Sequence, residues 1–362
     1  MMTIAGPNHP PAASRLDSVQ ALRALAAIAV VTHHVTFLQN GQWGVDLFFA
    51  ISGFIMCYVT ERSGEHFFLK RVIRIVPLYW AGTIGIYCIA IFKPALLAHT
   101  TNSIADLVRS LIFIPFKKGE RVFPVLFLGW TLNYEMFFYL LFALSMKISH
   151  KRRALIASAL IIAIVTVGQI VHFESVALRF FSKSILLEFA LGMLCYSLLG
   201  PHIRVAERPI AARIGWTLVG LLLIVWMPIA TELLAAEDRV LRWGIPAALA
   251  FYCIVRGLSA VRLPRPLILI GDASYSLYLF HPYVMQTFNE IFHAFSGGGL
   301  RPYLMALIAI LCCCGLAVLS YEFLENPILE RLRRMLIDRP PRALTQPALA
   351  AHSLSRGGSP RV

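Results

Sequence analysis

The chain has 362 residues, of which 58% are hydrophobic and only 14% are charged. Soluble domains carry about 25% charged residues, so this composition excludes a disordered chain and disfavours a soluble enzyme. The formal net charge of +14 would suggest a nucleic-acid partner for a soluble protein, but Lys and Arg also accumulate in the cytoplasmic loops of membrane proteins. We therefore expect a multi-pass membrane protein with no nucleic-acid partner.

Apolar stretches of near-membrane length recur along the chain, and each predicts a transmembrane helix. The ten stretches cover residues 21–38, 43–60, 75–92, 126–146, 154–172, 181–199, 214–234, 244–258, 267–288 and 302–324. The segment 104–116 is too short to span and is expected at an interface. The predicted fold class is an all-α, polytopic membrane helical bundle of about ten helices with a polar central cavity.

We expect three regions: a polar N-terminus over 1–20, a membrane domain over 21–330, and a basic, disordered tail over 331–362. Ten spans would place both termini on one side. With that side cytoplasmic, 23 of the Lys and Arg residues fall on inner segments and 10 on outer ones. This asymmetry predicts cytoplasmic termini. The seven cysteines show no spacing suited to zinc, so no metal site is expected.

Ionisable side chains inside the predicted spans point to function, because such groups are costly in a bilayer. They are Arg23, His33, His34, Asp46, Glu135, Glu188, Asp272 and His281. This is too many for side chains that merely reach the membrane surface. The set therefore predicts a polar cavity within the bundle.

The first span places two of these groups on one wall. Arg23 and His34 are eleven residues apart, which on a helix leaves them about 20° apart in angle and about 16 Å apart in rise. His33 falls about 80° from Arg23. A cation at the cytoplasmic mouth with a histidine deeper on the same wall suits a long anionic ligand. Alternatively, Arg23 binds lipid phosphate and His34 makes a hydrogen bond between helices.

A second basic cluster follows the second span and contains Lys70, Arg71 and Arg74. Arg71 and Arg74 are three residues apart, so on a helix they can bind one phosphate group together. Alternatively, these positive charges only keep the loop on the cytoplasmic side of the membrane, above all in the case of Lys70.

These residues carry a resemblance to the membrane-bound acyltransferase-3 family, whose members move acyl groups onto extracytoplasmic glycans and other acceptors. The matching pieces, in the family's order from about residue 16 to 330, are LRALAAIAVVTHH with its Arg-x10-His spacing, GVDLFFAISGFIM, KRVIRIVPLYW, WTLNYEMFFY, EFALGMLCY, GDASYSLYLFHP and YEFLENP. As a short form without an appended soluble hydrolase-like domain, the sequence is most similar to bacterial exopolysaccharide O-acetyltransferases. One departure from the family pattern is His33, a second histidine directly before His34.

The resemblance implies an enzyme of the bacterial inner membrane. It would transfer an acetyl group from cytoplasmic acetyl-CoA to a sugar hydroxyl of an exopolysaccharide or its lipid-linked precursor. Membrane lipid and the polysaccharide assembly machinery would be further partners. Other acceptors stay open, namely a periplasmic glucan, an O-antigen, a lipid or a small molecule, and so does a transporter.

Roles for individual residues follow from the same resemblance. Arg23, Arg71 and Arg74 would hold the CoA phosphates, and His34 would act as general base or as a transient acyl carrier. Asp46 or Glu135 would orient the His34 ring. The acceptor would touch Ser274, Tyr275 and His281.

Overall fold

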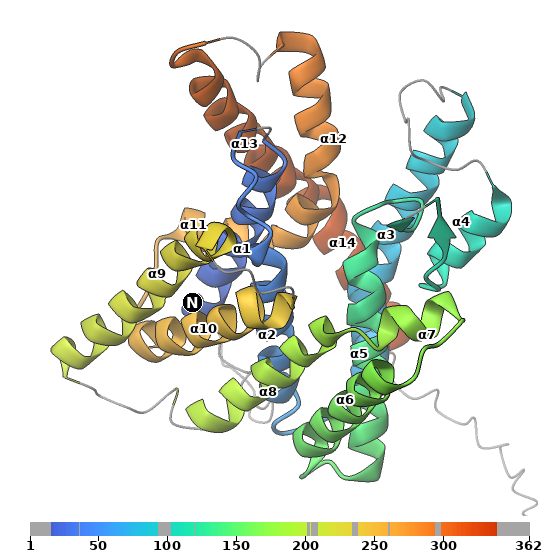
Figure 1. Cartoon of the computed structure of the whole chain (residues 1–362), viewed down its shortest axis with the longest axis vertical. Coiled ribbons are helices and arrows are strands. Elements are labelled where there is room, and N and C mark those ends of the chain that lie inside the picture. Colours follow the sequence, from blue (N-terminus) through green and yellow to red (C-terminus); the bar gives the residue numbers. More distant parts are fainter. Residues whose placement is uncertain are drawn as a thin grey trace, which may run out of the picture.

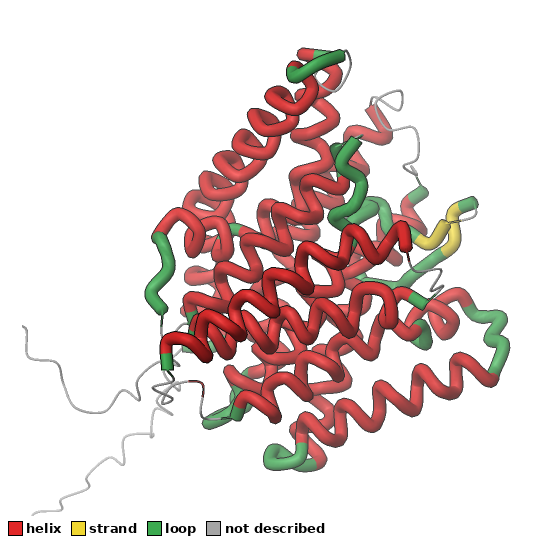
Figure 2. The backbone as a smooth tube through the Cα atoms, turned by 60° about the vertical axis from the view of Figure 1, so that its left-hand side comes forward, coloured by secondary structure: helices red, strands yellow, loops and turns green. Residues whose placement is uncertain are grey.

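The computed structural model describes residues 16–35, 37–92, 103–119, 121–200, 203, 209–233, 238–259, 261–293 and 298–338. Within these ranges the chain is almost entirely helical, with a short hairpin at one edge (Figure 2). Most of the predicted N-terminal region and of the predicted C-terminal tail lies outside the described residues, because residues 1–15 and 339–362 are not described.

The described residues of the first half form seven α-helices and the hairpin. In chain order these are α1 (Asp17–His33), α2 (Trp43–Val59), α3 (Phe67–Phe92), α4 (Ile104–Leu111), β1 (Lys117–Lys118), β2 (Arg121–Val122), α5 (Gly129–Ile148), α6 (Arg153–Ile170) and α7 (Val176–Phe181). The two strands pair antiparallel, with Lys117 opposite Val122 and Lys118 opposite Arg121.

The described residues of the second half form further α-helices and short 3-10 and π-helical turns. They are the 3-10 turn η2 (Ser184–Leu186), α8 (Leu187–Leu199), α9 (Ile210–Leu233), the π turn η4 (Val240–Gly244), α10 (Ile245–Leu258), α11 (Arg265–Asp272), α12 (Ser274–Phe292), α13 (Arg301–Ser320), the π turn η5 (Tyr321–Glu325) and α14 (Asn326–Leu336).

Each of the ten predicted spans contains helix in the described chain, and the segment 104–116 contains the short α4. Among the described residues, five helical stretches are long and apolar enough to cross a membrane: Phe67–Phe92, Arg153–Ile170, Ile210–Ile229, Val240–Leu258 and Arg301–Leu336. The prediction of a helical membrane protein is therefore confirmed, while the number of crossings stays a prediction. The range 267–288 is not one helix, because α11 ends at Asp272 and α12 begins at Ser274.

Helices α1 and α2 lie in the middle of the molecule (Figure 1). Helix α1 packs against α2, α11 and α12, and α2 packs in turn against α8 and α10. Helices α3, α5 and α6 lie to one side of this centre, and α12 and α13 form a projecting pair at another (Figure 1). Side chains of α1 therefore face several other helices at once.

Two glycines let neighbouring backbones approach α1 closely. A methyl group added at Gly44 of α2 would lie 2.4 Å from the carbonyl oxygen of Ala26, and one added at Gly271 of α11 would lie 2.1 Å from that of Gln20. Ala24 and Ala26 are fully buried on α1. Small residues at such crossings allow tight helix packing in membranes, so neighbouring helices hold α1 near its N-terminal end and at its middle.

Replacing Gly44 with alanine is expected to destabilise the protein, because the added methyl group meets backbone that cannot rotate away. Overpacking of this kind typically costs about 1–3 kcal/mol. The matched control is Gly215→Ala on α9, where an added methyl group meets nothing within 4 Å and alanine is the better helix former. Thermal unfolding in detergent should separate the two variants. Equal melting temperatures would contradict the tight crossing.

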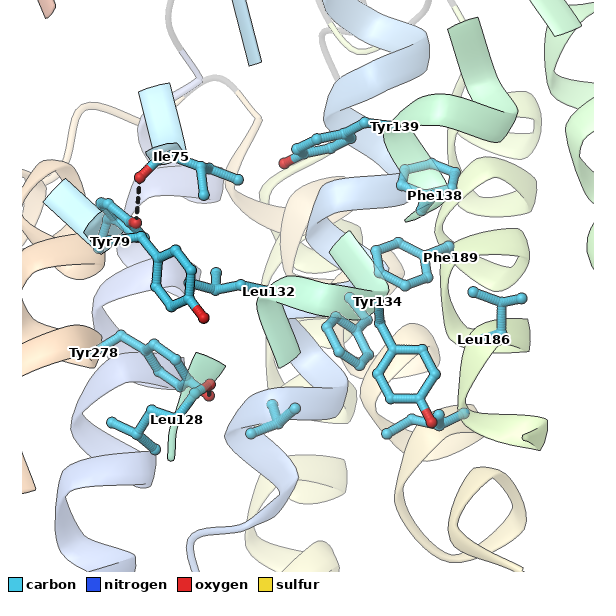
Figure 3. Packing of buried hydrophobic residues seen from close by; sticks show 14 of the residues in the cluster. Ile75, Tyr79, Leu128, Leu132, Tyr134, Phe138, Tyr139, Leu186, Phe189 and Tyr278 are labelled. Carbon is cyan, nitrogen blue, oxygen red and sulfur yellow. Dashed lines mark hydrogen bonds between the residues drawn. The ribbon is translucent and has the colours of Figure 1, made fainter. Parts of the chain in front are cut away.

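An aromatic core supports the side of the bundle that carries α5. The rings of Phe138 and Phe189 stack between α5 and α8 with centroids 4.3 Å apart (Figure 3). Tyr134 stacks on Phe180 with centroids 4.2 Å apart and donates a 2.7 Å hydrogen bond to the carbonyl oxygen of Phe180. This packing leaves the next residue, Glu135, on the part of α5 that faces α2.

Candidate active site

A cavity opens between α1, α2, α3, α5 and α12, with an empty volume of about 770 Å³ that includes space open to solvent. Apolar and aromatic side chains form much of its wall. Six of the residues predicted for the site also line it: Arg23, Arg71, Arg74, Glu135, Ser274 and Tyr275. The fold thus gathers residues from four helices that are separate in the sequence.

The cationic side of the cavity is built by α1 and α3. Arg71 and Arg74 lie about one turn apart on α3, and Arg23 faces them from α1. Within the described part of the chain, the buried Nε atom of Arg71 has no hydrogen-bond partner, and the guanidinium lies 5.8 Å from the centroid of the Phe67 ring. Buried guanidinium donors call for an acceptor, so this wall suits an anion.

Glu135 supplies a carboxylate on the same side of the cavity as these cations. Its Oε1 atom accepts a 3.1 Å hydrogen bond from the Ser52 hydroxyl of α2 and a short one from the Tyr139 hydroxyl, one turn along α5. The expected contact with His34 is not among the hydrogen bonds of the described chain. Glu135 therefore lies on the side of the site that holds the arginines.

His34 lies at the other end of α1, directly after the last helical residue. Its Nδ1 atom is 2.9 Å from the carbonyl oxygen of Val30 and 3.1 Å from Nε2 of His281. Tyr278, which precedes His281 by about one turn of α12, lines the cavity. The same face of α12 thus leads from the cavity to the histidine pair.

His33 is held separately from His34. Its Nδ1 atom lies 2.6 Å from the carbonyl oxygen of Gln39, in the loop that follows α1, and the two rings meet edge to face at 5.4 Å. The two histidines therefore have different partners, as their different angular positions on the helix predict.

The structure corrects the expectation that Asp46 orients His34. The Asp46 carboxylate is completely buried in α2 and forms a two-pronged ion pair with Arg239, with Nε–Oδ1 and Nη2–Oδ2 distances of 2.9 and 2.7 Å. Arg239 also stacks on the Trp243 ring at 4.8 Å. The carboxylate of Glu188 on α8 is also fully buried. It lies close enough to Asp46 and Arg239 to interact with the charges of both. A buried carboxylate needs such a cation nearby, which explains why Asp46 faces Arg239.

Removing this cation is expected to cost more than removing the pair. Arg239→Met leaves Asp46 buried without compensation, which typically costs about 3–5 kcal/mol. The double variant Asp46→Asn with Arg239→Met should recover much of that loss. Membrane abundance and melting temperature of the three proteins provide the measurement. If Arg239→Met is as stable as the parent, the ion pair does not support the fold.

The three residues assigned to the acceptor have different surroundings. Tyr275 donates a 2.8 Å hydrogen bond to the Ile75 carbonyl oxygen of α3. The Ser274 hydroxyl is buried and has no hydrogen-bond partner among the described residues, and His281 is only 1% exposed. Ser274 and Tyr275 therefore lie in the cavity near the arginines, whereas His281 contacts His34.

Sequence reasoning missed Arg239, Tyr139 and Tyr278. Nothing in the chain distinguishes Arg239 from other outer-loop cations, although a buried aspartate does call for some cation. Tyr139 follows Glu135 by one helical turn, and that spacing could have indicated the contact. Tyr278 follows the predicted Ser274 by the same spacing.

A family model described as an acyltransferase domain matches residues 16–321. The chain belongs to this acyltransferase family. The family predicted from the sequence motifs is thus confirmed, and the protein is a membrane acyltransferase. No solved structure matches the chain significantly.

Relatives of this acyltransferase carry informative names. The exopolysaccharide production protein ExoZ of Rhizobium meliloti (strain 1021) is 34% identical, with 83% of this chain and 92% of that protein covered. Nodulation protein 10 of Rhizobium leguminosarum bv. viciae is 26% identical, with 92% and 98% covered. The O-acetyltransferase OatA of Staphylococcus aureus (strain NCTC 8325 / PS 47) is 24% identical, and the match covers 87% of this chain but only 57% of OatA.

Proposed function

We propose that this acyltransferase transfers an acetyl group from cytoplasmic acetyl-CoA to a sugar hydroxyl of an exopolysaccharide or of its lipid-linked precursor. The protein would cross the bacterial inner membrane about ten times, with both termini in the cytoplasm. The charge asymmetry of the sequence supports this orientation.

One observation carries the donor assignment: three arginines from two helices line one cavity, and no described residue forms a hydrogen bond with the buried Nε of Arg71. Arginine binds phosphate through paired N–H donors. Acetyl-CoA carries three phosphate groups at one end and its thioester at the other. Its phosphates would bind Arg23, Arg71 and Arg74, and its pantetheine arm would extend along the wall of the cavity.

The position of His34 supports the chemistry. It lies about 16 Å in helical rise beyond Arg23, at the end of α1 that the proposed orientation places toward the outer face. As general base, the imidazole takes the proton of the sugar hydroxyl while the sugar oxygen attacks the thioester carbon. The carbon–sulfur bond breaks, and the CoA sulfur leaves with the electron pair and gains a proton from the imidazolium. As acyl carrier, an imidazole nitrogen of His34 first receives the acetyl group while the CoA sulfur leaves with the electron pair. The acetyl group then passes from this nitrogen to the sugar oxygen.

The acceptor assignment rests on the named relatives. ExoZ is an exopolysaccharide production protein, and OatA is an O-acetyltransferase. Together these names favour a glycan hydroxyl as the acceptor of the present enzyme.

Purified protein in liposomes, supplied with acetyl-CoA labelled in the acetyl group, tests the proposal. The acceptor would be exopolysaccharide, or lipid-linked precursor, from cells that lack the protein. We expect free CoA to appear together with label on the glycan, and neither to appear with His34→Ala. Label that crosses the bilayer as intact acetyl-CoA, without CoA release, would indicate a transporter instead.

A further inference from the structure

A second histidine contacts the proposed catalytic one. His281 of α12 is 1% exposed, and its Nε2 atom lies 3.1 Å from Nδ1 of His34, with the ring centroids 4.7 Å apart and the planes inclined by 70°. The two residues are 247 positions apart in the sequence. Each ring also faces backbone carbonyl groups, and these fix where the protons lie.

The proton position on His281 follows from its own helix. Its Nδ1 atom lies 3.0 Å from the carbonyl oxygen of Leu277 and 2.9 Å from that of Tyr278. A carbonyl oxygen can only accept a hydrogen bond, so Nδ1 must carry the hydrogen. In the neutral ring, Nε2 then presents a lone pair, and this lone pair points at His34.

The same reasoning applies to His34. Its Nδ1 atom faces two acceptors, the Val30 carbonyl oxygen at 2.9 Å and the Nε2 lone pair of His281 at 3.1 Å. Both contacts are favourable only if Nδ1 carries the hydrogen. The lone pair of His34 is then on Nε2, the nitrogen that neither of these contacts uses.

We propose that His281 is a positioning residue that holds His34 in the Nδ1–H tautomer and orients its unprotonated Nε2 toward the reacting groups. This inference rests on the proposed function, in which His34 acts as base or acyl carrier. His281 thereby takes the part that the sequence suggested for Asp46 or Glu135.

A neutral partner has a physical advantage at this depth. When Nε2 of His34 takes a proton from the acceptor hydroxyl, the ring becomes an imidazolium and its Nδ1–H continues to donate to the lone pair of His281. No proton passes to His281. The contact stabilises the cation without placing a permanent charge in the bilayer, where an unpaired ion is costly.

Conservative variants of His281 separate positioning from packing. In His281→Gln the amide oxygen can reach the place of Nε2 and accept from His34, whereas in His281→Asn the shorter side chain reaches only the place of Nδ1. We expect the glutamine variant to keep its kcat within about tenfold of the parent, and the asparagine variant to lose about a hundredfold or more. The KM for acetyl-CoA should change little in both, because the arginine cluster is untouched. Equal losses in the two variants at matched stability, or an unchanged kcat in His281→Asn, would overturn the proposal.

Nitrogen NMR provides a readout that does not require turnover. Protein labelled with ¹⁵N-histidine, with His34 assigned by comparison with His34→Gln, reports which ring nitrogen carries hydrogen. We expect hydrogen on Nδ1 in the parent and in His281→Gln, and a mixture of tautomers in His281→Asn. Hydrogen on Nε2 of His34 in the parent would overturn the inference. If the tautomer is as expected but no CoA is released, the proposed function fails, whereas the assignment of the His34 tautomer to its contact with His281 stands.

Discussion

Replacing His34 with alanine is expected to abolish nearly all acyl transfer, whereas His33→Ala should leave most of it. Loss of a general base alone typically lowers the rate by about 10²–10⁴-fold, and loss of an acyl carrier would remove the route altogether. His34 contacts His281 and Val30, while His33 contacts the Gln39 carbonyl in the following loop. The measurement is labelled glycan formed per mole of enzyme in liposomes.

His33→Ala is the matched control, because it removes the same kind of side chain from the neighbouring position. Both variants should show the melting temperature of the parent within a few degrees. An active His34→Ala together with an inactive His33→Ala would show that the Arg-x10-His spacing has been assigned to the wrong histidine.

The double replacement of Arg71 and Arg74 with alanine is expected to weaken binding of acetyl-CoA by at least about a hundredfold, since each charge-assisted contact contributes about 1.5–3 kcal/mol. Both side chains line the cavity. The loss should be smaller at high salt, because screening weakens the same contacts in the parent. Titration calorimetry in detergent provides the affinity.

A second pair of cations from the same region controls for net charge. Arg62 and Lys70 are exposed and do not line the cavity, so their joint replacement with alanine should leave donor affinity within about threefold. If both double variants lose affinity equally, the positive charge of this region attracts acetyl-CoA in a general way, and Arg71 and Arg74 do not form a specific phosphate site. If neither loses affinity, Arg71 and Arg74 serve only to orient the chain in the membrane.

Features that depend on local sequence were predictable. Apolar stretches located the helices, because the bilayer and the helical rise fix the length of a span. Helical periodicity predicts that Arg23 and His34 share one wall; Arg23 lines the cavity, and that His34 shares its wall stays a prediction. Arg71 and Arg74, which their three-residue spacing predicts to act together, both line the cavity, and for this pair the geometry of a single helix was sufficient.

Contacts between distant segments were not predictable in the same way. Asp46 is 193 residues from Arg239, and His34 is 247 residues from His281. Their pairing depends on how α2 meets the start of η4 and how α1 meets α12, which no single helix encodes. The break between α11 and α12 was also missed, although the sequence turns polar there, at Asp272 and Ser274.

The fixed position of α1 has a consequence for which donors can be used. Gly271 and Gly44 bring neighbouring backbones against its N-terminal end and its middle. Arg23 is thus held on a rigid helix that ends directly before His34, and their separation of about 16 Å in helical rise is set by that helix. Because this separation is fixed, the site selects a donor by the distance between its charged groups and its acyl carbon. A compact donor such as acetyl phosphate carries its charge beside its acyl carbon, and it cannot bind the arginines and reach His34 at once. The enzyme would thereby reject the cell's small activated acyl compounds by size, without any contact that recognises their chemistry.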